Sequence, residues 1–170
     1  WSGDAGLDGA ILSPEDAFRF ARGEEVKSNT GQMAKLKRPL DWIVITDHSD
    51  GMGTINEIRA GNPEMISDPF LKRMFEAMNG TDQEEAAAAT MELIARQSTG
   101  KLPKQLMDPR WMVSAWEKTA NIADKYNEPG KFSALIGYEF TPNPGGGNNL
   151  HRNVIYRDGA DLAVKERPLT

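Results

Sequence analysis

The stretch PLDWIVITDH, residues 39–48, decides the fold class. Its apolar part, Trp42 to Ile45, follows a proline, is unbroken and ends at polar residues. A short apolar run of this kind predicts a strand that is buried on both faces in a parallel sheet. Because parallel strands need a crossover between them, we expect helices to follow this strand.

Helical patterns and two further strands fill the rest of the chain. Residues 1–12 are rich in glycine and aspartate and are expected to form a loop. Ser13 and Pro14 then predict the start of a short amphipathic helix that ends near Gly23. Later helices are expected at 69–78, 82–97 and 108–126, and strands at 132–140 and 151–156. We therefore predict an α/β fold, in which the helical insertion at about 54–127 forms either a cap over the active end of the sheet or an outer layer.

Composition narrows the possible partners. Of the 170 residues, 20 are basic and 25 are acidic, giving a net charge of -5. There is no run of five like charges, so we expect no nucleic-acid partner. No stretch approaches the roughly 18 apolar residues of a membrane span. The absence of cysteine excludes disulfides and thiolate zinc sites and suits either cytoplasm or periplasm. The chain begins at Trp1, so we interpret it as part of a longer protein and leave its compartment open.

Polar side chains that can bind metals follow the predicted strands. Asp47 and His48 come directly after the first strand, and Glu139 lies at the end of the second. His151 begins the third strand after a glycine-rich loop, and it and His48 are the only histidines of the sequence. Because the carboxyl ends of parallel strands meet at one edge of a sheet, we expect these side chains to lie together. Imidazole and carboxylate suit zinc, manganese or iron, whereas the alternative is a hydrogen-bonded structural or general-base histidine.

Four blocks of the sequence resemble one known family. They are WSGDAG at 1–6, SPEDAFRFARGEEV at 13–26, RPLDWIVITDHSD at 38–50 and IGYEFTPNPGGGNNLHRNVIYRD at 136–158. In this order the blocks are similar to the DUF3604 family, a branch of proteins that resemble PHP (polymerase and histidinol phosphatase) domains. The resemblance covers nearly the whole chain. It implies that residues 1–170 form a partial PHP-type distorted (β/α)7 barrel with a helical insertion, truncated at both ends.

The resemblance also implies a metal site. Asp4, His48, Glu139 and His151 match ligands of a cluster that holds two or three divalent ions, which would be Zn, Mn or Fe. Asp47 matches a residue that orients the imidazole ligand. In the family, a His-x-His pair precedes the block that corresponds to WSGDAG at 1–6. This pair is missing from the sequence, and so are ligands that the family has later in the chain. We therefore expect that the remainder of the parent chain completes the site and that the isolated 170-residue piece is inactive.

The function that this resemblance implies is hydrolysis of a small anionic ester. A phosphoester is the first choice of substrate, cleaved by metal-activated water. Arg152, next to His151, is a candidate for contacting a phosphate or sulfate oxygen, and its alternative is a solvated arginine at a strand edge. Two other functions stay open: hydrolysis of a sulfate or carboxylic ester on the same site, and a non-catalytic PHP-like binding or structural module.

Overall fold

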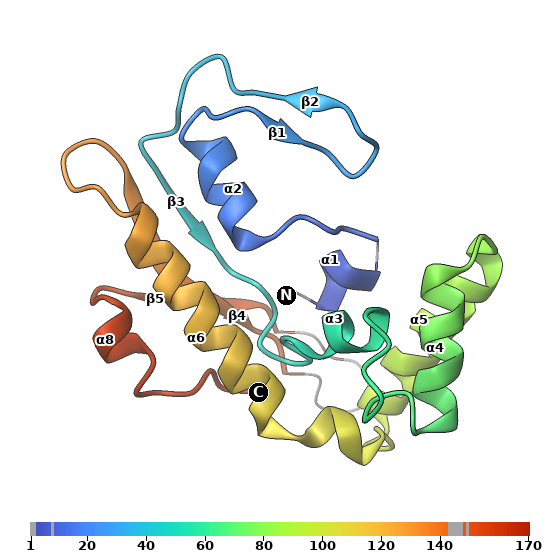
Figure 1. Cartoon of the computed structure of the whole chain (residues 1–170). Helices are drawn as coiled ribbons and strands as arrows, with labels where there is room; N and C mark the ends of the chain where they lie inside the picture. The colour runs from blue at the N-terminus through green and yellow to red at the C-terminus, as the bar shows by residue number, and fades with distance from the viewer. Residues whose placement is uncertain (1–2, 8, 143–147, 149) are drawn as a thin grey trace.

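A three-stranded mixed sheet lies at the centre of the larger part of the molecule (Figure 1). The structure is a computed structural model, which describes residues 3–7, 9–142, 148 and 150–170 and, for Asp4, the backbone only. The strand order is β3-β4-β5, and the strands are β3 (Trp42–Ile45), β4 (Ser133–Phe140) and β5 (Arg152–Tyr156). β3 runs parallel to β4, and β5 runs antiparallel to β4. The three strands predicted from the sequence are therefore confirmed.

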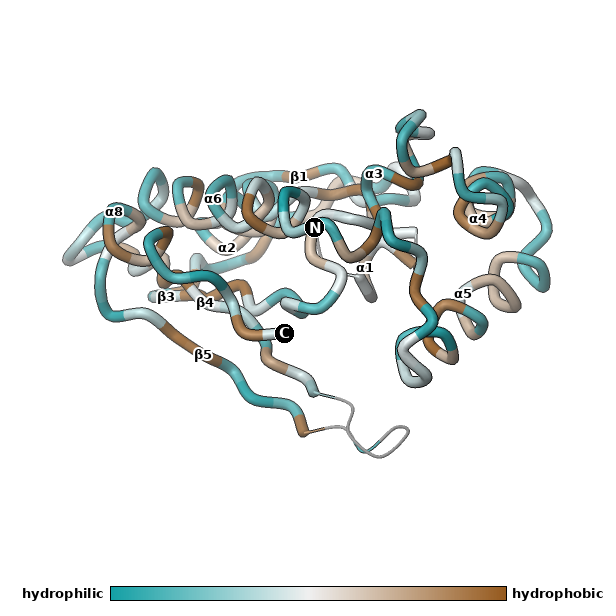
Figure 2. Tube along the Cα trace, turned by 90° about the horizontal axis from the view of Figure 1, so that it is seen from below, coloured by the Kyte–Doolittle hydropathy of each residue, from teal (hydrophilic) through white to brown (hydrophobic). Residues whose placement is uncertain are grey.

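Helices cover one face of this sheet (Figure 2). They are α2 (Pro14–Ala21), α6 (Pro109–Tyr126) and α8 (Ala160–Ala163). Trp116 of α6 is only 1% exposed and packs edge-to-face on Tyr138 of β4, with ring centroids 5.7 Å apart. Its indole Nε1 donates to the carbonyl oxygen of Ala163 at 3.2 Å, so one side chain joins the sheet to two helices. Burying a large aromatic ring with its donor satisfied stabilises this layer.

The other face of the sheet carries no helix among the described residues. Trp42 and Ile155 are 59% and 50% exposed, and the remaining residues of β3 are only half-buried. The expectation that the first strand is buried on both faces is therefore wrong for the described part of the chain. An unbroken apolar run predicts a strand, but it does not determine which of the two faces a neighbouring element covers.

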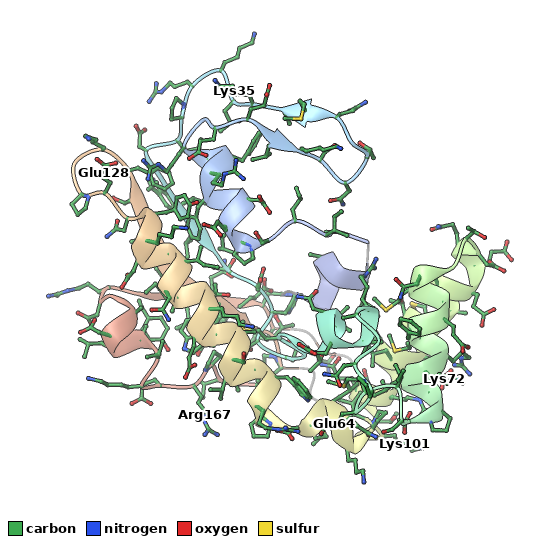
Figure 3. The ribbon with its side chains drawn as sticks, viewed as in Figure 1. Lys35, Glu64, Lys72, Lys101, Glu128 and Arg167 are labelled. Carbon is green, nitrogen blue, oxygen red and sulfur yellow. The ribbon has the colours of Figure 1, made fainter. Side chains whose placement is uncertain are left out.

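A second group of helices forms a separate lobe beside the sheet (Figure 1). It contains α3 (Thr54–Arg59), α4 (Pro69–Asn79), α5 (Gln83–Ser98) and the 3-10 helix η1 (Lys104–Met107). Its own buried core includes Ile58, Met65, Leu71, Met74 and Leu93. Figure 3 shows the charged side chains of Lys72 and Lys101 at the outer edge of this lobe.

The three long helices predicted between the strands are confirmed. α4, α5 and α6 begin directly after Asp68, Asp82 and Asp108, whose side chains accept hydrogen bonds from the first backbone N–H groups of each helix. Aspartate at this position satisfies donors that have no partner within the helix. The predicted insertion at 54–127 contains two different structures, because α3 to η1 build the separate lobe whereas α6 packs on the sheet.

Short elements near the start of the chain complete the fold. Gly3–Leu7 form the helix α1, so the expectation of a loop over residues 1–12 is wrong for this segment. β1 (Val26–Lys27) and β2 (Met33–Ala34) pair as a small antiparallel hairpin. The described residues form these two sheets and no closed barrel, and the α/β class is confirmed. None of the helices in the described part combines the length and apolar character that a bilayer crossing requires.

Candidate metal centre

The pairing of β3 with β4 brings His48 beside Glu139. The parallel register places Ile45 opposite Ile136, and beyond the strand an isolated bridge pairs His48 with Glu139. The backbone N–H of Glu139 donates to the carbonyl oxygen of Asp47 at 2.9 Å. The N–H of Ser49 donates to the carbonyl oxygen of Glu139, also at 2.9 Å. These backbone bonds hold the two side chains next to each other at the carboxyl end of the parallel pair, as predicted.

The antiparallel strand β5 brings His151 to the same edge. The register pairs Arg152 with Phe140, so His151 lies across from the buried residue Thr141. The hydroxyl of Thr141 donates to Oε1 of Glu139 at 3.0 Å, and it lies 3.3 Å from Nδ1 of His151. Nδ1 of His151 also hydrogen-bonds to Oε1 of Glu139. Thr141 therefore ties the carboxylate to the second imidazole.

Three potential ligand atoms converge at this edge. One ligand atom each from His48, Glu139 and His151 lies within 4.8 Å of the other two. Nε2 of His48 is 4.0 Å from Oε1 of Glu139, and the two imidazole rings meet edge-on with centroids 5.8 Å apart. The side chains of His48 and Glu139 are 17% and 19% exposed, whereas that of His151 is 56% exposed. The group is thus fixed on its inner side and open to solvent at His151.

The surroundings of Glu139 keep its carboxyl group ionised. Burial by itself raises the pKa of Glu139, but hydrogen bonds from His151 and Thr141 and the charges of the two imidazoles outweigh burial. The pKa of Glu139 therefore lies below its ordinary value. A carboxylate that is ionised at neutral pH is the form that binds a cation.

Asp50 lies beside the Nδ1 atom of the His48 ring. Oδ1 of Asp50 is 3.5 Å from Nδ1 of His48, and its other oxygen, Oδ2, accepts a hydrogen bond from Nε2 of Gln97 on α5 at 2.5 Å. Sequence reasoning missed both residues. Asp50 stands only two positions after His48, which is a local signal, but Gln97 is 47 residues away in the sequence and only the tertiary fold brings it close.

The remaining predicted site residues lie in other positions. Asp47 is among the residues that line a second cavity, of about 390 Å³, together with Ile45 and Phe20. Arg152 is exposed. It pairs with Phe140, whereas Glu139 pairs with Asn153, so Arg152 and Glu139 lie on opposite faces of the sheet. Asp4 lies in α1, but its side chain is outside the described residues, so its role as a ligand stays a prediction.

A cavity of about 540 Å³ opens at the candidate metal centre. His48, Asp50, Thr141 and His151 are among its polar lining residues, and Gln97 links Asp50 to α5. Residues of the helical lobe and of the start of α6 line it as well. This volume is within the range of small-molecule sites.

Comparison with known proteins identifies the family but not an activity. The family model described as "Protein of unknown function (DUF3604)" matches residues 1–170 of the chain. No curated protein and no solved structure gives a significant match.

Proposed function

The chain belongs to the DUF3604 family, and we propose that it carries the metal site of a hydrolase that acts on small phosphoesters. The observation that carries this proposal is the convergence of the only two histidines of the sequence with Glu139, their ligand atoms all within 4.8 Å of one another. The proposal includes a PHP-type barrel with β3, β4 and β5 in its wall. Helices on one face of the strands and reactive groups at the carboxyl ends of β3 and β4 support it.

The donor set fits a divalent transition metal. Two imidazoles and one carboxylate are ligands that Zn, Mn and Fe bind. Two ligand atoms that are each about 2.1 Å from one tetrahedral ion lie roughly 3.4 Å from each other. The 4.0 Å between His48 Nε2 and Glu139 Oε1 is close to this spacing. His151 is exposed enough to turn from its hydrogen bond with Glu139 toward an ion. Two or three ions, as the family resemblance implies, would need further ligands, for which Asp4 is the candidate.

The chain's own residues would hold and orient these ligands. Glu139 presents a carboxylate whose position is fixed by the hydroxyl of Thr141. Asp50 lies at Nδ1 of His48, which favours the tautomer that carries its proton there and leaves Nε2 as the ligand atom. A divalent ion bound here would supply Lewis-acid chemistry, because it lowers the pKa of water and attracts the oxygens of an anionic ester.

Arg152 has no step in this proposal, since the register places it on the face opposite Glu139. The negative charge of the substrate would then be met by the cation. A sulfate or carboxylic ester could bind in the same manner, and a module that binds metal without turnover uses the same ligands.

An ester panel tests the proposal. The parent protein that contains this chain would be incubated with Mn2+, Zn2+ or Fe2+ and with the nitrophenyl esters of phosphate, sulfate and acetate, beside its His48→Gln variant. Metal-dependent release of nitrophenol from the phosphate ester, lost in the variant, is the expected result. Cleavage of sulfate or acetate alone would identify a different hydrolase. Stoichiometric metal binding without cleavage of any ester would indicate a binding module.

A further inference from the structure

The cavity at the candidate metal centre is lined by both polar and apolar residues, and we call the apolar residues from the helical lobe its apolar side. Leu93, Leu102 and Leu106 line the apolar side and also pack in or against the core of the helical lobe. Ile94 and Met107 line it as well, but they are 47% and 67% exposed and belong to neither buried core of the described residues. Two apolar side chains thus face the cavity without contributing to a core.

Helix α5 connects the apolar side directly to the metal centre. Ile94 and Gln97 are three positions apart, so they lie on neighbouring turns of one helix face. Gln97 donates to Asp50, whose other oxygen lies beside His48. A ligand whose charged end lies at His48 therefore has an apolar surface within the same cavity.

The charges of the cavity restrict the kind of ligand. Among the described residues that line it there is no lysine or arginine, and its acidic side chains are those of Asp50 and Asp108. A polyanion such as a nucleic-acid strand would meet no cationic groups beyond the metal centre. A small molecule with one anionic group and one apolar group matches both sides.

We propose that Ile94 and Met107 bind the apolar part of the substrate, so that the substrate is a small anionic ester carrying an aryl or short alkyl group. This inference rests on the proposed function and specifies its substrate class. Burial of an apolar group in such a cavity adds affinity without altering the metal ligands.

A set of glutamine variants distinguishes the contribution of the apolar side to ligand binding from that of the metal centre. Ile94→Gln and Met107→Gln remove apolar surface at exposed positions, so they should leave the fold intact. Met91→Gln is the matched control, because Met91 lies one turn earlier on α5, is 64% exposed and is outside the residues that line the cavity. The probes are methylphosphonate and phenylphosphonate, which differ in the apolar group alone. Calorimetry would measure their binding at saturating Mn2+, after Mn2+ binding has been measured separately.

We expect phenylphosphonate to bind about ten-fold more tightly than methylphosphonate to the unmodified chain and to the Met91 variant. In the Ile94 and Met107 variants this preference should fall to about three-fold or less, with Mn2+ and methylphosphonate affinities unchanged. Equal binding of the two phosphonates to a Mn2+-loaded chain, or a preference that the two variants leave unchanged, would overturn the inference and leave the proposed function standing. Failure to bind any of Mn2+, Zn2+ and Fe2+ would overturn both.

Discussion

Replacement of Asp50 by asparagine tests how the structure orients His48. The carboxylate has two acceptor oxygens, one 3.5 Å from Nδ1 of His48 and one that accepts from Gln97. An amide has a single acceptor oxygen, so asparagine can serve the imidazole or Gln97 but not both. The variant should therefore bind the metal more weakly while keeping the shape of the site.

The magnitude follows from the geometry. Loss of the group that orients a histidine ligand typically costs 10- to 100-fold in metal affinity (order of magnitude). A separation of 3.5 Å is longer than the N–H···O range, which ends near about 3.2 Å. We therefore expect the lower end of that effect, about ten-fold, equivalent to about 1.4 kcal/mol.

The assay is calorimetric titration with Mn2+ of the unmodified chain, Asp50→Asn and Asp158→Asn. Asp158 is exposed, follows β5 and is outside the residues that line the cavity, so it is the matched control. We expect the Asp158 variant to stay within about 0.5 kcal/mol, roughly two-fold, of the unmodified chain. A loss for Asp50→Asn no larger than that for Asp158→Asn would refute the reasoning from the structure.

Three further predictions concern the fold and its response to pH. Ser13→Ala removes the acceptor of a reciprocal cap with Asp16 at the start of α2, and should lower the free energy of unfolding by about 1 kcal/mol in chemical denaturation. An unchanged denaturation midpoint would contradict this. Gly53→Ala should cost at least about 2 kcal/mol, because Gly53 has φ +81° and a Cβ would lie 2.6 Å from the carbonyl oxygen of Trp111. Gly100→Ala is its control, with φ +66° and nothing within 4 Å, and an equal cost at both positions would show that the clash is absent. Since the folded pKa of Glu139 is lowered, its contribution to stability is present above the ordinary value of 4.5 and is lost as pH falls through the folded pKa. Denaturation at a series of acidic pH values should show a smaller decline for Glu139→Gln, and an identical decline would contradict the lowered pKa.

Local patterns were sufficient to predict most of the elements. Aspartate followed by proline or a polar first turn marks the start of α4, α5 and α6. An unbroken apolar run marks β3, and a mainly apolar run marks β4. α3 was missed, because its short sequence TINEIR follows two glycines, Gly51 and Gly53, and its Ile55 and Ile58 are buried in the core of the helical lobe. The covered and uncovered faces of β3 depend on elements distant in sequence, so the apolar run could not distinguish them.

The sequence predicted those residues of the candidate site that lie at the ends of strands. His48, Glu139 and His151 were predicted together because each lies at the end or start of a strand, and the structure brings the three side chains to one edge. The partners that orient them were not predictable in full. Gln97 reaches Asp50 from a helix of the separate lobe, and no periodicity in the sequence records that contact.

The most direct test of the central claim uses the fact that the chain contains only two histidines. A sample labelled with 15N in histidine has just two imidazole spin systems, which NMR can follow during titration with Zn2+. We predict that both respond to the same first equivalent of zinc, with Nε2 of His48 and Nδ1 of His151 as the bound atoms. A response from one ring alone, or from neither, would contradict a shared metal centre.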